Sequence, residues 1–165
     1  MIDALIVYLR AALPEMRGEA STIGREVELA RAYAAVLQVP RGAAFEIETR
    51  ADAGVREVTL PPMVLLPLVQ AALACDNVDV RRRFAIAAYA SPSGTTISVE
   101  VEGGLRPAAW EGEGPEAAGR TLLAYFGATA RLDYVPEGVV HRAQIHLLPT
   151  FGRSGLRLAS AQPSA

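Results

Sequence analysis

The chain has 165 residues, of which 51% are hydrophobic and 21% charged, and its formal net charge is −2. This length suits one domain, or one domain with a helical lead-in, and it can bury a sizeable core. The near-neutral balance gives no general field for nucleic acid. The single cysteine, Cys75, excludes an internal disulfide and fits a reducing cytoplasm. The sequence contains no apolar run of membrane-spanning length and starts without the basic region of a signal peptide.

Two helices are predicted at the start of the chain. Apolar residues recur at helical spacing over residues 2–13. A second helix starts at Ser21 or Thr22, whose hydroxyl groups can cap its first turn, and ends near Gln38. Glu26 is expected on the polar flank of this second helix. The apolar faces of both helices are a candidate dimer surface.

Alternation of polar and apolar residues predicts the strands. Strands at residues 45–50 and 55–60 could pair as a first hairpin. A second hairpin is predicted with strands at residues 84–89 and 95–102, and a third with strands at residues 129–135 and 139–148. Residues 115–126 between the last two hairpins form a helical pattern. His141 and His146 lie five residues apart on one strand, so they should face opposite sides and make a poor shared metal site.

The stretch from Leu60 to Asp76 reads LPPMVLLPLVQAALACD and is the most apolar part of the chain. Between Met63 and Cys75, Gln70 is the one polar side chain, which predicts a helix buried on nearly all sides. The two prolines at its start suit the first turn of a helix. Pro67 predicts a kink or a frayed first turn.

The predicted order of elements is α-α-β-β-α-β-β-α-β-β, which indicates an α+β two-layer sandwich. We divide the chain into a helical lead-in (residues 1–40), one domain (residues 41–150) and a tail rich in Gly, Ser and Pro (residues 151–165). The composition of the tail predicts disorder.

Two segments carry a resemblance to a known family. LPPMVLLPLVQAALACD resembles the N-box of LytS/YehU-type sensor histidine kinases, members of the GHKL ATPase superfamily. STIGREVELARAYAAVLQVPRG resembles the linker helix of these kinases, and YLRAALPEMR resembles the segment after their phosphoacceptor helix. The resemblance implies a GHKL (Bergerat) fold, with a mixed sheet covered by helices on one face, and a place in two-component signalling.

The resemblance also implies that the chemical groups of the family are replaced in this chain. The family's magnesium-binding Asn falls on Ala71 and the Glu before it falls on Gln70. The adenine-reading Asp and the Asn after it fall on Gly103 and Gly104. A glycine has no side chain that can accept a hydrogen bond from adenine. The family's phosphoacceptor motif is not found in the sequence.

Gly112 and Gly114 match two glycines of the family's glycine box, and Trp110 replaces the first. Glycines before a helix let the backbone approach a phosphate. Several acidic residues surround them and would repel a triphosphate unless a metal intervenes, so a plain flexible loop is the alternative interpretation. Trp110 is expected to fold inward over the vacated base site.

We therefore expect a degenerate, cytoplasmic histidine-kinase-like domain that acts as a pseudokinase or regulatory binding module. It is expected to have no catalytic residue, no metal site and no cofactor. The implied partners are a second copy or a histidine kinase in a dimer, and a response regulator. Two alternatives stay open. One is a divergent catalytic fragment that binds ATP and magnesium and phosphorylates a histidine on another chain; the other is an unrelated α+β interaction domain.

Overall fold

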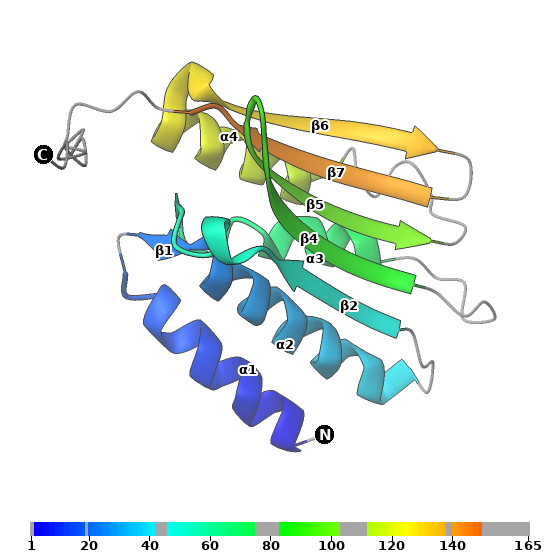
Figure 1. The fold of residues 1–165 in the computed structure, drawn as a ribbon. Coiled ribbons are helices and arrows are strands. Elements are labelled where there is room, and N and C mark those ends of the chain that lie inside the picture. The colour runs from blue at the N-terminus through cyan, green and yellow to red at the C-terminus, as the bar shows by residue number, and fades with distance from the viewer. Residues whose placement is uncertain are drawn as a thin grey trace, which may run out of the picture.

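A computed structural model gives the arrangement of the helices and strands (Figure 1). It describes residues 2–18, 20–41, 46–74, 83–102, 112–137 and 140–149. The elements are α1 (Ile2–Glu15), β1 (Ser21–Thr22), α2 (Ile23–Arg41), β2 (Glu46–Ala51), η1 (Ala53–Val55), β3 (Thr59–Leu60), α3 (Leu66–Leu73), β4 (Arg83–Ser91), β5 (Gly94–Glu102), α4 (Glu113–Phe126), η3 (Gly127–Thr129), β6 (Ala130–Glu137) and β7 (Val140–Leu147). The predicted α+β class is confirmed.

Five strands form a mixed sheet in the order β2-β4-β5-β7-β6, and β1 and β3 form a separate two-stranded sheet. β2 runs parallel to β4, and the other neighbours are antiparallel. The β4–β5 and β6–β7 pairs confirm the second and third predicted hairpins. Their register places apolar residues opposite one another, as with Ile86 and Val99, because alternation assigns one face of each strand to the core.

The first predicted hairpin is wrong. β2 pairs with β4, and the chain after β2 makes two short turns, in which Val55 N–H donates to the Asp52 carbonyl and Val58 N–H to the Val55 carbonyl. These local bonds use backbone groups that a hairpin would need. Only Thr59 and Leu60 are extended, and they pair with β1, far away in the sequence.

The bounds of α2 and α3 differ from the predicted ones. α2 continues to Arg41, beyond the predicted end near Gln38. α2 starts at Ile23, and the Thr22 hydroxyl accepts a hydrogen bond from the Arg25 N–H at 3.4 Å, as a cap does. α3 starts at Leu66, so the two prolines after Leu60 precede the helix. Pro67 lies in its first turn, where a missing N–H costs no helical hydrogen bond. Pro67 therefore lies in the first turn of α3 and not in its interior, where a proline would kink the helix.

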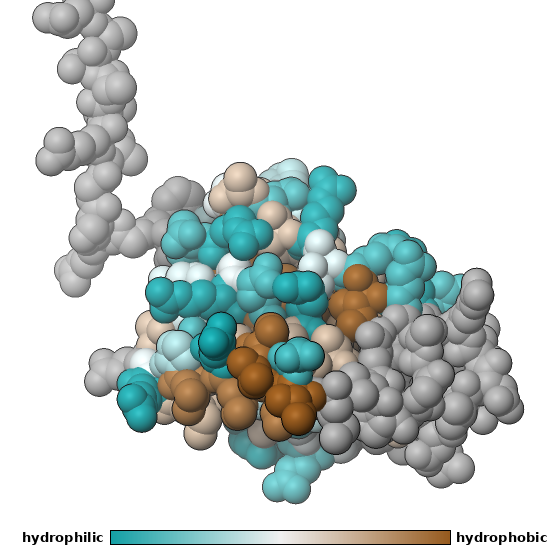
Figure 2. Space-filling model, turned by 90° about the horizontal axis from the view of Figure 1, so that it is seen from below, coloured by the Kyte–Doolittle hydropathy of each residue, from teal (hydrophilic) through white to brown (hydrophobic). Residues whose placement is uncertain are grey.

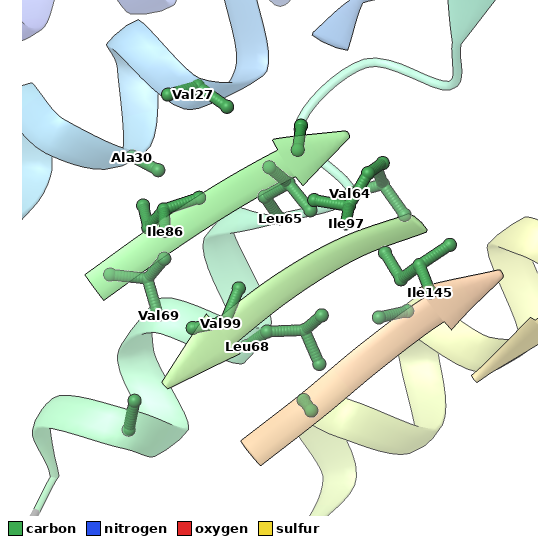
Figure 3. Packing of buried hydrophobic residues seen from close by; sticks show 14 of the residues in the cluster. Val27, Ala30, Val64, Leu65, Leu68, Val69, Ile86, Ile97, Val99 and Ile145 are labelled. Atoms are coloured by element: carbon green, nitrogen blue, oxygen red, sulfur yellow. The ribbon is translucent and has the colours of Figure 1, made fainter. Parts of the chain in front are cut away.

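The core lies between the sheet and the helices on one of its faces. Side chains from α2, α3, β4, β5 and β7 point into one shared cluster (Figure 3). Leu68 and Val69 of α3 are fully buried there, together with Ile86 of β4 and Ile97 of β5. α2 contributes to this same cluster, although residues 1–40 are predicted as a separate lead-in; that division stays a prediction. The tail after residue 149 lies outside the described residues.

α1 and α4 bury less of their apolar surface than their patterns predict. α1 packs on α2, with the rings of Tyr8 and Tyr33 5.6 Å apart, and leaves large aliphatic side chains in solvent. On α4, Leu122 is buried, but Leu123 is 62% exposed and Tyr125 is 45% exposed. α4 therefore leaves part of its apolar surface exposed. None of the described helices is both long and apolar enough to span a membrane.

Substituting Leu68 by Ala should lower the free energy of unfolding by about 3 kcal/mol, because it removes buried methyl groups and leaves a cavity under the sheet. The matched control is Leu123→Ala, an exposed leucine on α4, with an expected loss of about 0.5 kcal/mol or less. Urea unfolding followed by far-UV circular dichroism measures both. Equal losses in the two variants would contradict the placement of α3 at the centre of the core.

Candidate functional site

The candidate site lies where the first turns of α3 and α4 meet. If a Cβ atom were added to Gly114, near the start of α4, it would lie 3.6 Å from the Pro67 side chain and carbonyl oxygen on α3. Gly112 caps α4 in an extended conformation, with φ of −81° and ψ of 172°. The two helix starts are thus close enough to line one site, with α3 held from below by the core.

A buried carboxylate fixes the segment that leads into α3. Glu26 of α2 is 1% exposed, and its two carboxylate oxygens accept hydrogen bonds from the Met63 N–H at 2.7 Å and the Leu65 N–H at 3.2 Å. Met63 has φ of 60°, a left-handed conformation that costs a non-glycine residue about 1–2 kcal/mol. Charge-assisted hydrogen bonds from two nearby N–H groups offset that cost. Glu26 is therefore not on the polar flank of α2, as the sequence predicts, but inside the protein.

Burial is the largest influence on this carboxyl group and raises the pKa of Glu26. The N–H groups of Met63 and Leu65 and the hydroxyl of Ser21 lower the pKa, because they stabilise the charged form. The negative charge of Glu15 raises it further. Desolvation outweighs the hydrogen bonds, so ionising Glu26 costs free energy in the folded protein even though its acceptors are both used.

The side chains that α3 offers to the site are Gln70, which is exposed, and Ala71, which is 7% exposed and belongs to the hydrophobic core. An alanine methyl cannot ligate a metal ion. The described residues contain no group of three or more His, Cys, Asp or Glu side chains that could hold one. At this place α3 therefore supplies packing and one exposed amide.

The first turn of α4 carries its own negative charge. Glu113 and Glu116 both lie there, and Glu116 pairs with Arg120 one turn later at 3.2 Å. Carboxylates at this end complement the partial positive charge of the helix N-terminus. Their negative charge opposes the binding of a phosphate at this helix start. Gly114 lies within α4 and Gly112 caps it, so neither the loop interpretation nor the phosphate interpretation of these glycines is tested, and both stay predictions.

Several predicted positions lie outside the described residues. They are the two glycines of the degenerate Asp box, Gly103 and Gly104, together with Trp110 and its expected inward fold, and Cys75. β5 is described up to Glu102, immediately before the two glycines. Of the six predicted pocket positions, the structure places Gln70 and Ala71 on α3 and Gly112 and Gly114 at the start of α4.

The two histidines lie on β7 and face opposite sides, as predicted. His146 Nδ1 is 3.3 Å from the hydroxyl of Thr96 on β5, and its Nε2 is 3.8 Å from a carboxylate oxygen of Asp133 on β6. His141 shares the side of Ala143, which is buried against the helices. Neither histidine lies on the elements that form the candidate site.

Sequence reasoning missed the role of Glu26. A signal for it is present, because Glu26 lies three residues after Ile23 and four before Ala30, on the face of α2 that turns to the core. A charged residue on a buried helical face requires a partner. The pattern indicates that a partner exists, but it does not say that the partner is the backbone before α3.

Comparisons with known proteins agree on the fold. No protein-family model and no curated protein sequence matches the chain. Among solved structures, the catalytic domain of histidine kinase ThkA matches with a TM-score of 0.60 and 10% identity, covering 78% of this chain and 94% of that one. Acinetobacter baumannii histidine kinase AdeS matches with a TM-score of 0.55 and 12% identity, covering 89% and 76%.

A third structure is the histidine kinase domain of the Erythrobacter litoralis EL346 blue-light activated histidine kinase. It matches with a TM-score of 0.57 and 18% identity, covering 88% of this chain and 79% of that domain. The chain therefore has the fold of histidine kinase catalytic domains, as the resemblance of residues 60–76 implies. At identities this low, the likeness concerns the fold and leaves the chemistry to the residues of the site.

Substituting Glu26 by Gln should lower the free energy of unfolding by about 1–3 kcal/mol, because an amide has one acceptor oxygen and its NH₂ group would face a backbone donor. The loss should depend on pH. Because the pKa of Glu26 is raised in the folded protein, its contribution to the free energy of unfolding is fully present below the ordinary pKa of glutamate. That contribution is lost as pH rises through the pKa of the folded state. The difference in free energy of unfolding between the wild type and Glu26→Gln should therefore become smaller as pH rises.

Urea unfolding at a series of pH values from about 4, near the reference pKa of Glu, up to about 8 tests this. Glu28→Gln is the matched control, because Glu28 is exposed on the same helix and pairs with Arg31. Its loss should stay below about 1 kcal/mol. If the loss of unfolding free energy in Glu26→Gln grows with rising pH, the inference that burial outweighs the hydrogen bonds in setting the pKa of Glu26 is wrong.

Proposed function

We propose that the chain is a pseudokinase-like GHKL domain of two-component signalling, which keeps the fold and acts by binding a protein partner. The observation that carries the proposal is the state of α3. Its scaffold matches the N-box pattern and is held in place by Glu26, yet the position of the family's metal ligand is Ala71, within the hydrophobic core. A fold kept without its ligating groups is suited to a role in binding.

The energetic argument concerns two contacts. Loss of a metal ligand and loss of a carboxylate that reads adenine each cost on the order of a few kcal/mol. Since about 1.4 kcal/mol corresponds to a tenfold change in affinity, the two losses move a micromolar nucleotide site to millimolar or weaker. Gln70 is exposed and carries an amide, which is a weaker ligand for magnesium than a carboxylate.

The proposed partners belong to the same signalling chemistry. A histidine kinase subunit or a response regulator would meet a domain that resembles a kinase catalytic domain in shape. A cytoplasmic setting is part of the proposal, because both kinds of partner work there. The domain would then act by binding a response regulator in place of a kinase, or by binding a kinase subunit and changing how the active kinase assembles.

Calorimetric titration of ATP with magnesium into the purified chain tests the proposal. We expect no micromolar binding by the unmodified chain, and weak binding by the double variant Ala71→Asn with Gly103→Asp, which restores the two family residues. Gly54→Asp is the matched control for added charge, because Gly54 is exposed with no atom within 4 Å of an added Cβ. It should bind no nucleotide. Micromolar binding by the unmodified chain would overturn the proposal and support a divergent catalytic fragment.

A further inference from the structure

A pocket of about 500 Å³ lies between the second half of α1, the start of α2 and the turn after η1. Three arginines line it, one from each of these segments: Arg10, Arg25 and Arg56. All three are exposed, and none makes an ion pair within the described ranges of the chain. Arginines elsewhere in the fold do pair, as Arg31 does with Glu28. The pocket therefore presents three guanidinium groups that can bind the acidic groups of a ligand.

Backbone contacts at the start of α2 fix the positions of two of these arginines. The Arg25 N–H donates to the Thr22 hydroxyl at 3.4 Å, and the Arg56 carbonyl accepts from the Gly24 N–H at 2.9 Å. A Cβ atom added to Gly24 would lie 3.3 Å from that carbonyl and 3.6 Å from Nε of Arg56, so a glycine here lets the turn approach the helix closely. The Arg56 side chain therefore lies against the first turn of α2, the turn that carries Arg25.

The side of the pocket formed by α1 has the opposite charge. Glu15 lines the pocket and is 4% exposed, and its Oε2 has no hydrogen-bond partner in the part of the chain that the structure describes. A buried carboxylate oxygen without a donor costs free energy. The negative charge of Glu15 also raises the pKa of Glu26, so the two buried carboxylates are close enough to repel each other. A positively charged donor beside Glu15 would reduce both costs.

The balance of charges in the pocket indicates the class of ligand. Glu28 also lines the pocket but is bound by Arg31, so Glu15 and Glu57 are the lining carboxylates without an ion pair among the described residues. Three arginines and two such carboxylates leave one positive charge. A ligand with two carboxylates and one ammonium group carries one negative charge, and it supplies acceptors for the arginines and a donor for Glu15. A phosphate ion would offer Glu15 no positive charge.

The pocket is separate from the other surfaces of the molecule described above. Figure 2, which views the molecule from the side of α1, shows hydrophobic side chains gathered in one patch. From the same helix, the pocket instead takes the charged side chains of Arg10 and Glu15. The apolar face of α2, which the sequence offers as half of a dimer surface, is used by the core. The candidate site lies at the starts of α3 and α4, and none of the described residues of these helices lines the pocket.

We propose that this pocket binds a free acidic amino acid of the class of L-glutamate and L-aspartate. The two carboxylates of the ligand accept hydrogen bonds from the guanidinium groups of Arg10, Arg25 and Arg56, and its ammonium group donates to Glu15. The pocket volume lies within the range of small-molecule sites. Because the ligand contacts α1, α2 and the turn after η1 together, its binding stabilises their packing. The proposal does not depend on whether the nucleotide site is active.

Calorimetric titration of L-glutamate and of L-aspartate into the full chain, in a buffer without carboxylate or phosphate, tests the proposal. At least one of them should bind with a Kd below about 1 mM and raise the Tm of the chain. Arg56→Gln should weaken this binding at least about 10-fold, because it removes a charge-assisted contact. Arg50→Gln is the matched control, since Arg50 is an exposed arginine of β2 that pairs with Asp52 away from the pocket, and it should leave the Kd unchanged.

Ligands without an amine test the contact with Glu15. Glutarate and succinate have the carboxylates of glutamate and aspartate but no ammonium group, and each should bind at least about 10-fold more weakly than the corresponding amino acid. Glu15→Gln should remove this preference and bring the two kinds of ligand within about 3-fold of each other. Far-UV circular dichroism should show that the variants fold.

The absence of binding by both amino acids at about 10 mM would overturn the proposal. An Arg56→Gln variant that binds the amino acid as tightly as the wild type does would also overturn it, because the arginines would then not form the site. If the wild type binds glutarate and L-glutamate equally, Glu15 does not bind an ammonium group, and the assignment of an amino acid is wrong. None of these measurements uses ATP, so failure here is distinct from failure of the proposed function.

Discussion

The arrangement of this domain depends on the carboxylate of Glu26. It lies inside the protein, where a charged group is costly, and it binds two backbone N–H groups of the segment before α3. These bonds hold Met63 in a left-handed conformation and set the point at which α3 begins. Because α3 lies at the centre of the core and at the edge of the candidate site, one residue of α2 positions both.

This dependence connects the helical start of the chain with the site. α2 packs its apolar face into the same core as the sheet, and α1 packs on the outer side of α2 (Figure 1). A ligand bound between α1 and the start of α2 would therefore act on the helix that carries Glu26. At the site the two helix starts lie close together, and α3 places the methyl group of Ala71 where the resemblance of residues 60–76 implies a ligand.

Some of this could be predicted and some could not. The β4–β5 and β6–β7 hairpins follow from alternation and nearby turns, since their strands are close in sequence. The pairing of β3 with β1 was beyond reach, because a strand of two residues carries no detectable period and its partner lies far away. At the site, the sequence shows Gln70 and Ala71 directly, and the resemblance implies that they stand in place of the family's Glu and Asn. The hydrogen bonds that Glu26 accepts from the Met63 and Leu65 N–H groups cannot be predicted from local sequence, because they join residues 37 and 39 positions apart.

By itself, the sequence determined the kinds of element, most of their bounds, the α+β class and the apolar character of α3, because each of these depends on periodicity within a few turns of chain. The tertiary structure alone decided which buried face carries a charge, which strand pairs with β2, and which apolar side chains of α1 and α4 stay in solvent. The physical reason is that burial and pairing are properties of two segments together. A local pattern shows that Leu9 and Leu123 are apolar, but only the packed neighbours decide that both remain exposed.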